Sequence, residues 1–121
     1  MASPGPRPRL LVVDDERYNR ELLLRTFARQ ADVTVAADRA EALAACGAAG
    51  FDVVITDQRL ASGRGTELAA ELRRRWPAMR IVLITGAVDD PDVTAARGAG
   101  VIDDVIGKPF APVSLRERVL P

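Results

Sequence analysis

The stretch Phe51–Asp57 (FDVVITD) decides the fold, because it is an apolar run that ends in a carboxylate. Its four consecutive apolar or β-branched residues, Val53 to Thr56, predict a fully buried strand of a parallel sheet. An unpaired charge is costly to bury inside such a strand. At the strand's carboxyl end, however, it can project into the crevice where open α/β sheets bind their ligands. Asp57 is therefore either a turn-former, which is a frequent role of aspartate, or a functional carboxylate.

Four further stretches have the apolar or alternating composition of strands, and they alternate with five helical segments. We expect strands at Leu10–Asp15, Asp32–Ala37, Arg80–Gly86 and Val101–Gly107, and the alternating segment DVTVAA to be an edge strand. We expect helices at Arg17–Arg29, from Asp38 to about Cys46, and at Thr66–Trp76, Asp89–Gly98 and Ala111–Leu120. Five repeats of strand and helix predict an α/β domain in which a parallel sheet is covered on both faces.

Single residues mark where several of these segments begin and end. Asp38 is a candidate N-cap, and Glu41 three residues later completes a capping-box pattern. Gly47 is expected to end that helix, and Pro77 is expected to stop the helix that precedes it. The segment Gln58–Gly65 (QRLASGRG) is expected to be a loop after the Asp57 strand.

The composition is that of an ordinary globular domain, and it excludes several kinds of site. The chain has 121 residues, of which 48% are hydrophobic and 28% charged, and its net charge is zero. Bulk charge therefore gives no support to binding of nucleic acid or of an anionic membrane. The apolar runs are shorter than the roughly 20 residues of a membrane span. The absence of histidine excludes histidine-based zinc sites and nucleophiles that a histidine activates.

The two ends and the single cysteine complete the expected organisation. Met1–Pro8 is rich in proline and is expected to be a flexible tail, so that residues 9–121 form the domain. The N-terminus lacks the apolar core of a signal peptide. The single cysteine, Cys46, excludes an internal disulfide and fits a reducing compartment such as the cytoplasm. Its Ala-rich helical context indicates a small core residue.

Polar residues gather at the carboxyl ends of the predicted strands, which lie on one edge of a parallel sheet. They are Asp14, Asp15, Asp57, Thr85 and Lys108. Carboxylates held a few ångströms apart repel one another, so one is protonated, or they turn into water, or they share a cation. Mg²⁺ prefers oxygen ligands and also accepts phosphate oxygens. A cation, an ammonium and a hydroxyl around a free carboxylate would suit phosphoryl transfer to that carboxylate.

These residues resemble the receiver domain of bacterial two-component response regulators. The acidic pair Asp14-Asp15, the central Asp57, Thr85 with Gly86, and the run Lys108-Pro109-Phe110 all match in order, and the resemblance covers the chain after its tail. It implies a flavodoxin-like, doubly wound fold with five parallel strands in the order 2-1-3-4-5.

The resemblance also implies a role for each residue of the site. Asp57 would accept the phosphoryl group, Lys108 would pair with the phosphoryl oxygens, and Thr85 would hydrogen-bond the phosphorylated state. Mg²⁺ would be bound directly by Asp15, Asp57 and the backbone carbonyl of Arg59, and by Asp14 largely through water. The Lys108–Pro109 peptide bond would be cis.

As a receiver, the chain would be a signalling module that catalyses only its own phosphorylation and dephosphorylation. Its donor would be a histidine kinase, a histidine phosphotransfer protein or a small acyl phosphate, and its output would be a downstream partner or domain that the sequence does not identify. Family likeness also suggests a homodimer face on the fourth helix, fifth strand and fifth helix, near Arg97, Asp103, Asp104 and Arg116.

Three other functions use a similar fold. The chain could be a receiver-like interaction module that is not phosphorylated, although the full set of site residues argues against this. A Mg²⁺-dependent aspartyl phosphatase would need a second aspartate two residues after its nucleophile, where Arg59 stands. A flavin-binding protein would need a phosphate-cradling loop after the first strand, where Asp14-Asp15-Glu16 would repel phosphate.

Some positions depart from the family pattern. Val105 replaces a common aromatic residue whose ring couples to the threonine, so the coupling must take another form here. Gly107 is smaller than usual, and Ala61 stands where proline is frequent. We expect the triplet Arg73-Arg74-Arg75 to be a solvated helix end beside Trp76, and nucleic-acid binding through it is the weaker alternative.

Overall fold

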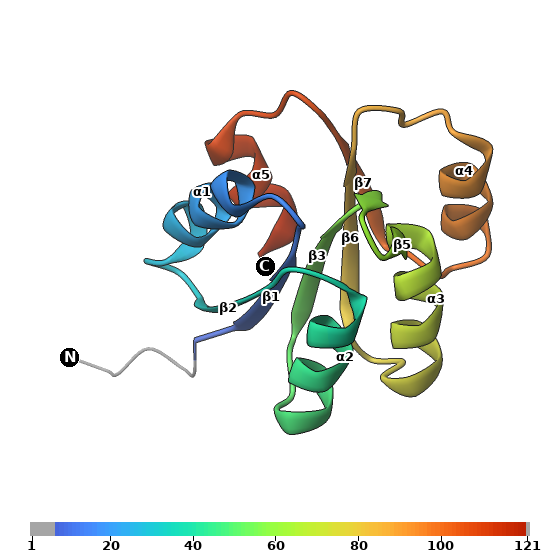
Figure 1. Ribbon diagram of the computed structural model, residues 1–121. Helices are drawn as coiled ribbons and strands as arrows, with labels where there is room; N and C mark the ends of the chain where they lie inside the picture. Colours follow the sequence, from blue (N-terminus) through green and yellow to red (C-terminus); the bar gives the residue numbers. More distant parts are fainter. Residues whose placement is uncertain (1–6, 121) are drawn as a thin grey trace.

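Five strands pair in parallel in the order β2–β1–β3–β6–β7, in a computed structural model that describes residues 7–120 (Figure 1). The strands are β1 (Arg9–Val13), β2 (Asp32–Ala36), β3 (Val53–Asp57), β6 (Arg80–Thr85) and β7 (Asp104–Gly107). When these five strands are numbered 1 to 5 along the chain, their order across the sheet is 2-1-3-4-5. The expected flavodoxin-like, doubly wound fold is thus confirmed, with the alternating strand at one edge.

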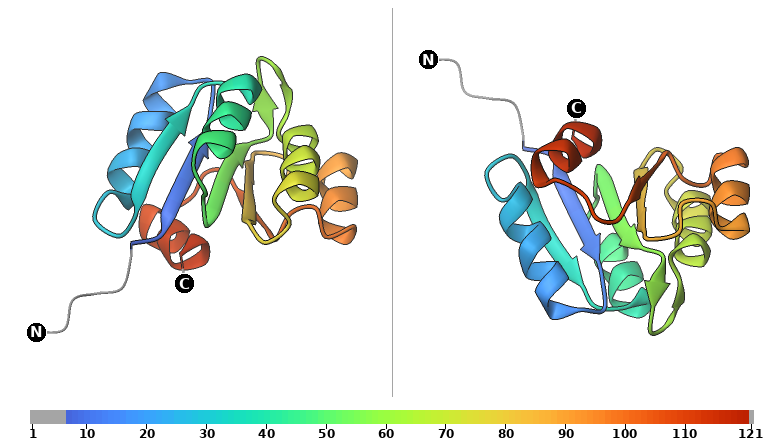
Figure 2. Two further views of the ribbon diagram at one scale, coloured as in Figure 1. Left: turned by 90° about the horizontal axis from the view of Figure 1, so that it is seen from below. Right: turned by 90° about the horizontal axis from the view of Figure 1, so that it is seen from above.

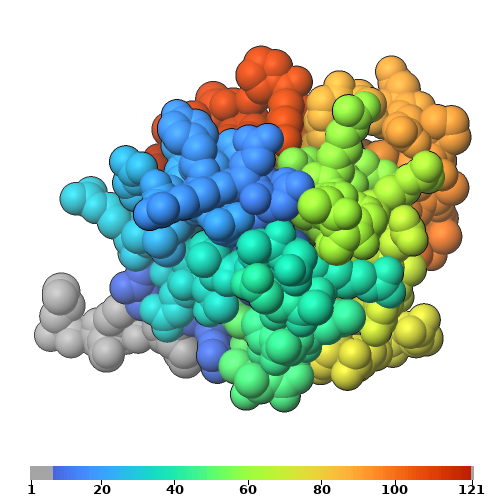
Figure 3. Space-filling model, in the orientation of Figure 1, coloured from blue at the N-terminus to red at the C-terminus, as the bar shows by residue number. Residues whose placement is uncertain are grey.

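Helices cover both faces of the sheet, as two views from its ends show (Figure 2). The helices are α1 (Arg17–Phe27), α2 (Arg39–Ala48), α3 (Gly65–Arg75), α4 (Pro91–Gly98) and α5 (Pro112–Val119). Buried residues of α1 and α5 join one core cluster, and those of α2, α3 and α4 join the other. The space-filling view shows surface of α1, α2 and α3 in the orientation of Figure 1 (Figure 3).

Strand β3 contributes to both clusters, because its successive side chains point to opposite faces. Val54 packs into the cluster beneath α2 and α3, whereas Val53 and Ile55 pack into the cluster beneath α1 and α5. All three residues are buried. The strand is therefore buried on both faces, and Asp57 is its first residue that is not fully buried.

Helix α2 begins where the sequence predicts and ends later than it predicts. The Asp38 carboxylate accepts a hydrogen bond from Glu41 N at 2.8 Å, and Glu41 in turn accepts one from Ala37 N at 3.3 Å. The expectation that Gly47 ends the helix is wrong, since α2 continues to Ala48. Gly47 keeps a helical conformation there, and apart from its chain neighbours and the backbone of its own helix, no heavy atom lies within 4 Å of where its Cβ would be. Cys46 is buried as expected, and this burial raises the pKa of its thiol.

Two other segments differ from the sequence prediction. The expected loop Gln58–Gly65 contains a small antiparallel hairpin, β4 (Arg59–Leu60) and β5 (Gly63–Arg64). The last strand begins at Asp104 rather than at Val101. Asp103 itself bonds to Ile81, whose N–H donates to the Asp103 carboxylate at 2.8 Å and whose carbonyl accepts from Asp103 N at 2.8 Å.

The arginine triplet at the end of α3 is only partly a solvated helix end. Arg73 donates to the carbonyls of Val101, Pro77 and Met79 and to the Asp103 carboxylate. The expectation of a solvated side chain is therefore wrong for Arg73. Trp76 is the C-cap of α3, and the guanidinium of Arg75 lies 4.6 Å from the centre of its ring.

Residues 1–6 of the expected tail lie outside the described part of the chain. Arg7 and Pro8 belong to the folded unit, because Pro8 O accepts from Asp32 N at 2.9 Å and Arg7 donates to the carbonyls of Ala28 and Ala31. None of the helices described between residues 7 and 120 has the length and apolar character needed to cross a membrane.

Candidate functional site

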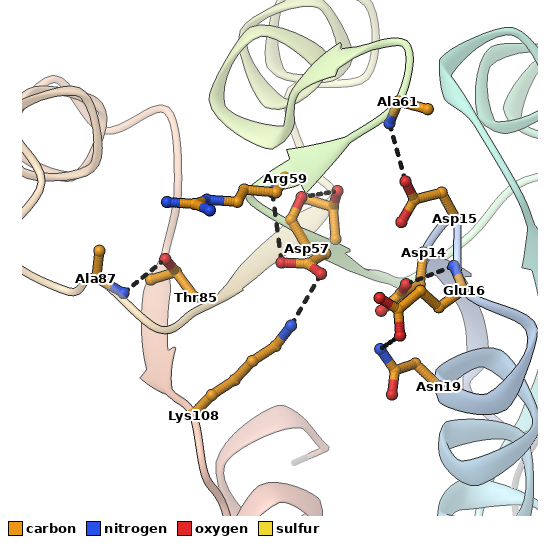
Figure 4. Close-up of polar contacts among 11 residues, drawn as sticks. Asp14, Asp15, Glu16, Asn19, Asp57, Arg59, Ala61, Thr85, Ala87 and Lys108 are labelled. Atoms are coloured by element: carbon orange, nitrogen blue, oxygen red, sulfur yellow. Dashed lines mark hydrogen bonds and ion pairs between the residues drawn. The ribbon is translucent and has the colours of Figure 1, made fainter.

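The parallel sheet brings the predicted polar residues to one edge (Figure 4). Asp57 and Thr85 are the last residues of β3 and β6, and Lys108 directly follows β7. A cavity of about 480 Å³ opens there. It is lined by Asp15, Glu16, Asp57, Arg59, Thr85, Gly86, Ala87 and Lys108. The sequence prediction of a shared crevice is therefore met for Asp15, Asp57, Thr85 and Lys108.

Asp57 is held on both of its oxygens. Lys108 Nζ donates to Asp57 Oδ2 at 2.9 Å, and Arg59 N lies 3.4 Å from Oδ1. The Asp57 side chain is 11% exposed and that of Lys108 is 36% exposed. Lys108 thus neutralises the charge of the mostly buried Asp57 carboxylate. Its side chain reaches Asp57 from the side opposite to Arg59 (Figure 4). The Lys108–Pro109 peptide bond is cis, as the resemblance implied.

The acidic pair divides between two environments. Asp14 is buried, and its Oδ1 accepts from Glu16 N at 2.9 Å. Burial raises the pKa of the Asp14 carboxyl, with a smaller contribution from the charge of Asp57. Asp15 is exposed at the mouth of the cavity, and its Oδ2 accepts from Ala61 N at 3.0 Å. Asp14 lines a neighbouring cavity instead.

Of the three aspartates predicted to hold a divalent cation, Asp15 and Asp57 line this cavity and Asp14 does not. Among the described residues, no group of three histidine, cysteine or acidic side chains is placed to hold a metal ion. Asp15, Asp57 and Arg59 nevertheless line one cavity, and two carboxylates with a carbonyl suit Mg²⁺, which keeps several waters.

The Thr85 hydroxyl is engaged by the loop that follows its own strand. It accepts a hydrogen bond from Ala87 N at 3.0 Å, and Thr85 is buried. This bond uses a lone pair of the Thr85 oxygen, so the hydroxyl keeps its O–H donor for a group on Asp57.

Val105, at the position of the expected aromatic switch, is a 9% exposed core residue of β7. A Cβ at Gly107 would lie 3.2 Å from Val88 Cγ1, so the exposed Val88 covers this glycine.

Sequence reasoning missed the residues that fix the chain after Asp57. Gln58 is buried, and its side chain accepts from Thr66 N at 2.9 Å and donates to Thr66 Oγ1 at 3.3 Å. A Cβ on Gly65 would lie 2.2 Å from the carbonyl oxygen of Asp57. A glycine directly before the predicted helix Thr66–Trp76 was the one available signal, because the Gln58 bonds depend on a fold that its sequence neighbours do not reveal.

Comparison with known proteins gives one consistent family. The model described as "Response regulator receiver domain" matches residues 10–120. A response regulator receiver protein of Anaeromyxobacter sp. is 38% identical over 104 residues, which cover 85% of this chain and 43% of the relative. The transcriptional regulatory protein AruR of Pseudomonas aeruginosa is 40% identical over 117 residues, which cover 92% and 47%. The chain thus spans less than half the length of these curated relatives.

Solved structures agree with this result. A CheY-like response regulator receiver domain from Methanospirillum hungatei has a TM-score of 0.86 at 27% identity, with 93% of this chain and 90% of that one covered. The response regulator TrrA of Thermotoga maritima, in complex with Mg²⁺-BeF, has a TM-score of 0.79 at 29% identity, with 92% and 95% covered.

Proposed function

This chain belongs to the response regulator receiver domain family of two-component signalling, and from that membership we propose that Asp57 is its phosphoacceptor. The observation that carries the proposal is the ion pair of Asp57 with Lys108, 2.9 Å long, inside an oxygen-lined cavity. One carboxylate oxygen of Asp57 attacks phosphorus, the bond from phosphorus to the donor atom breaks, and an acyl phosphate forms.

The side chains around Asp57 supply charge and position. Lys108 holds the carboxylate in place and neutralises negative charge on the transferred oxygens. Asp15, Asp57 and the Arg59 carbonyl would hold Mg²⁺, and Asp14 would contact it through water. When bound, the ion neutralises further charge on the phosphoryl oxygens. Thr85 donates its hydroxyl proton to an oxygen of the phosphorylated Asp57.

The phosphorylated domain presents a changed surface to a partner. Phosphorylation adds about −1.5 to −2 charges and three acceptor oxygens, which draw in Thr85 and the segments that follow β3 and β6. Receiver domains work with histidine kinases and output domains. For this chain, we assign the donor to a histidine kinase, a histidine phosphotransfer protein or a small acyl phosphate. We extend the proposed domain, residues 9–121, to begin at Arg7, because the Arg7 guanidinium donates to the carbonyls of Ala28 and Ala31.

A homodimer through α4, β7 and α5 has less support. Arg97 and Arg118 lie on this face, and both pair with Asp104 of the same chain, at 3.7 and 2.7 Å. These charges are therefore already matched within one copy.

Incubation with acetyl phosphate and Mg²⁺, followed by intact mass measurement, tests the phosphoacceptor. We expect the mass of one phosphoryl group to be added to the wild type and to Asp89→Ala, an exposed control outside the crevice. We expect no addition to Asp57→Ala. An unmodified wild type, or an equal adduct on Asp57→Ala, contradicts the proposal and favours an interaction module that is not phosphorylated.

A further inference from the structure

The β4–β5 hairpin meets the proposed cation site at two points. Arg59, at the start of β4, lines the cavity. Ala61, in the turn between β4 and β5, donates its backbone N–H to Asp15 Oδ2 at 3.0 Å. Asp15 lies 46 residues earlier in the chain, so this bond joins two separate walls of the crevice.

We propose that the backbone amide of Ala61 positions the Asp15 carboxylate for the divalent cation. An aspartate has two oxygens with about four lone-pair sites. The amide uses one site on Oδ2, while the other oxygen lies on the side of the crevice that holds Asp57 (Figure 4). The bond thus fixes the carboxylate without occupying the oxygen that faces the site.

The benefit of this bond follows from the exposure of Asp15. An exposed carboxylate rotates among several orientations, and ordering it on cation binding costs conformational entropy. A hydrogen bond to a ligand carboxylate orients it beforehand, and loss of such a partner typically weakens metal affinity about 10- to 100-fold. Position 61 offers this donor because it is an alanine; proline has no N–H to give.

The hairpin is itself anchored at other points, so the Ala61 amide has a fixed place. Ser62 Oγ accepts from Arg39 N at 3.1 Å, and Arg64 N donates to Glu67 Oε1 at 3.2 Å. The Arg64 guanidinium also pairs with Asp92 on α4. These bonds do not involve the amide of Ala61, and they remain when its proton is removed.

Ala61→Pro removes this donor with little other change. The described backbone contains no positive φ at a residue other than glycine, so Ala61 is free of the left-handed conformation that proline cannot adopt. Leu60 lies in strand β4, and an extended backbone suits the residue before a proline. Ala61→Ser is the matched control, because it keeps the N–H.

The experiment is calorimetric titration of the unphosphorylated protein with MgCl₂. We expect the Kd for Mg²⁺ to rise about ten-fold in Ala61→Pro and to stay unchanged in Ala61→Ser. In an Asp15→Ala background, Ala61→Pro should not change the Kd for Mg²⁺ further, because the carboxylate that the Ala61 amide would position is absent. A loosened hairpin, by contrast, would lower the affinity in both backgrounds. A backbone ester in place of the Ala61 amide removes the same proton without a ring.

The inference rests on the proposed cation site, and the outcomes separate the two. A wild type that binds no Mg²⁺ overturns both. A wild type that binds Mg²⁺, with Ala61→Pro or the ester variant binding equally well or more tightly, overturns the role of Ala61 alone. An equal loss with and without Asp15 also overturns it. Circular dichroism of each variant verifies that the sheet and helices are retained.

Discussion

Gly65 places the start of α3 directly against the backbone of Asp57. A Cβ there would lie 2.2 Å from Asp57 O and 2.9 Å from Leu83 Cδ1. We therefore expect Gly65→Ala to lower the free energy of unfolding by at least about 1–3 kcal/mol, the usual cost of overpacking. Urea unfolding followed by circular dichroism measures this change.

Gly47→Ala is the matched control, since no heavy atom lies within 4 Å of its Cβ position in α2. An alanine there should raise the free energy of unfolding by about 0.5–1 kcal/mol. Similar effects at both glycines would show that helix propensity, and not the contact with Asp57, sets the cost at Gly65.

The residues of the site divide into those that a sequence reveals and those that it hides. Asp15, Asp57, Thr85 and Lys108 could be predicted, because parallel strands end at one edge and each of these residues ends or follows a strand. Ala61 could not be given a role. It acts through its backbone amide, and every residue except proline carries such a group.

In α2, the beginning of the helix was easier to predict than its end. Asp38 marks the start of α2 with a side chain that bonds the first turn. The end of α2 has no such marker, and Gly47 tolerates the helical conformation that surrounds it. The last strand occupies only the end of the predicted range Val101–Gly107, because the Asp103 carboxylate accepts from Ile81 N in place of a backbone carbonyl.

Arg73 fastens the end of α3 to two neighbouring loops. It donates to three backbone carbonyls and to Asp103. Hydrogen bonds from charged groups contribute about 1.5–3 kcal/mol each at most, and less where water competes. We expect Arg73→Ala to lower the free energy of unfolding by about 2–3 kcal/mol. The adjacent exposed Arg74 provides the control, and Arg74→Ala should stay within about 0.5 kcal/mol. Equal effects in urea would mean that Arg73 is solvated after all.

The Arg39–Glu71 pair joins α2 to α3, and its effect should depend on pH. The Arg39 guanidinium, which hydrogen-bonds the Glu71 carboxylate, lowers the pKa of that carboxyl from its ordinary value of 4.5. A lowered folded-state pKa stabilises the protein above the unfolded value and loses this contribution as the pH falls through the folded value.

Glu71→Gln should therefore reduce the free energy of unfolding near neutral pH, and the difference from wild type should shrink as the pH falls below 4.5. Urea unfolding at several pH values measures this trend. Glu117→Gln, at an exposed glutamate of α5, should show no such trend. A pH-independent difference at Glu71 would assign the effect to packing.

The architecture of the whole molecule could be predicted from its alternating pattern, because strands and helices that alternate form a parallel sheet with helices on both faces. The strand order needed the family resemblance, since alternation alone permits several orders. The β4–β5 hairpin was missed because two-residue strands carry no hydrophobic period.

Ligands bound in the Asp57 cavity should stabilise the entire domain, since a ligand that binds only the folded state of a protein raises the melting temperature of that protein. We expect Mg²⁺ with beryllofluoride, a phosphoryl mimic, to raise the melting temperature of the wild type in circular dichroism and to leave Asp57→Ala unchanged. An equal rise in both proteins would place the ligand elsewhere.

Trp76 gives the molecule an optical probe that is remote from its chemistry. It caps the end of α3, whereas Asp57 touches the start of that helix, and an 11-residue helix is about 16 Å long. The ring stacks on Arg75, so its fluorescence reports on the packing of that helix end. Emission from the single tryptophan should thus follow the folded fraction of the protein and stay unchanged on phosphorylation. A loss of folding can therefore be measured in the same sample in which the phosphorylation of Asp57 is followed by another method.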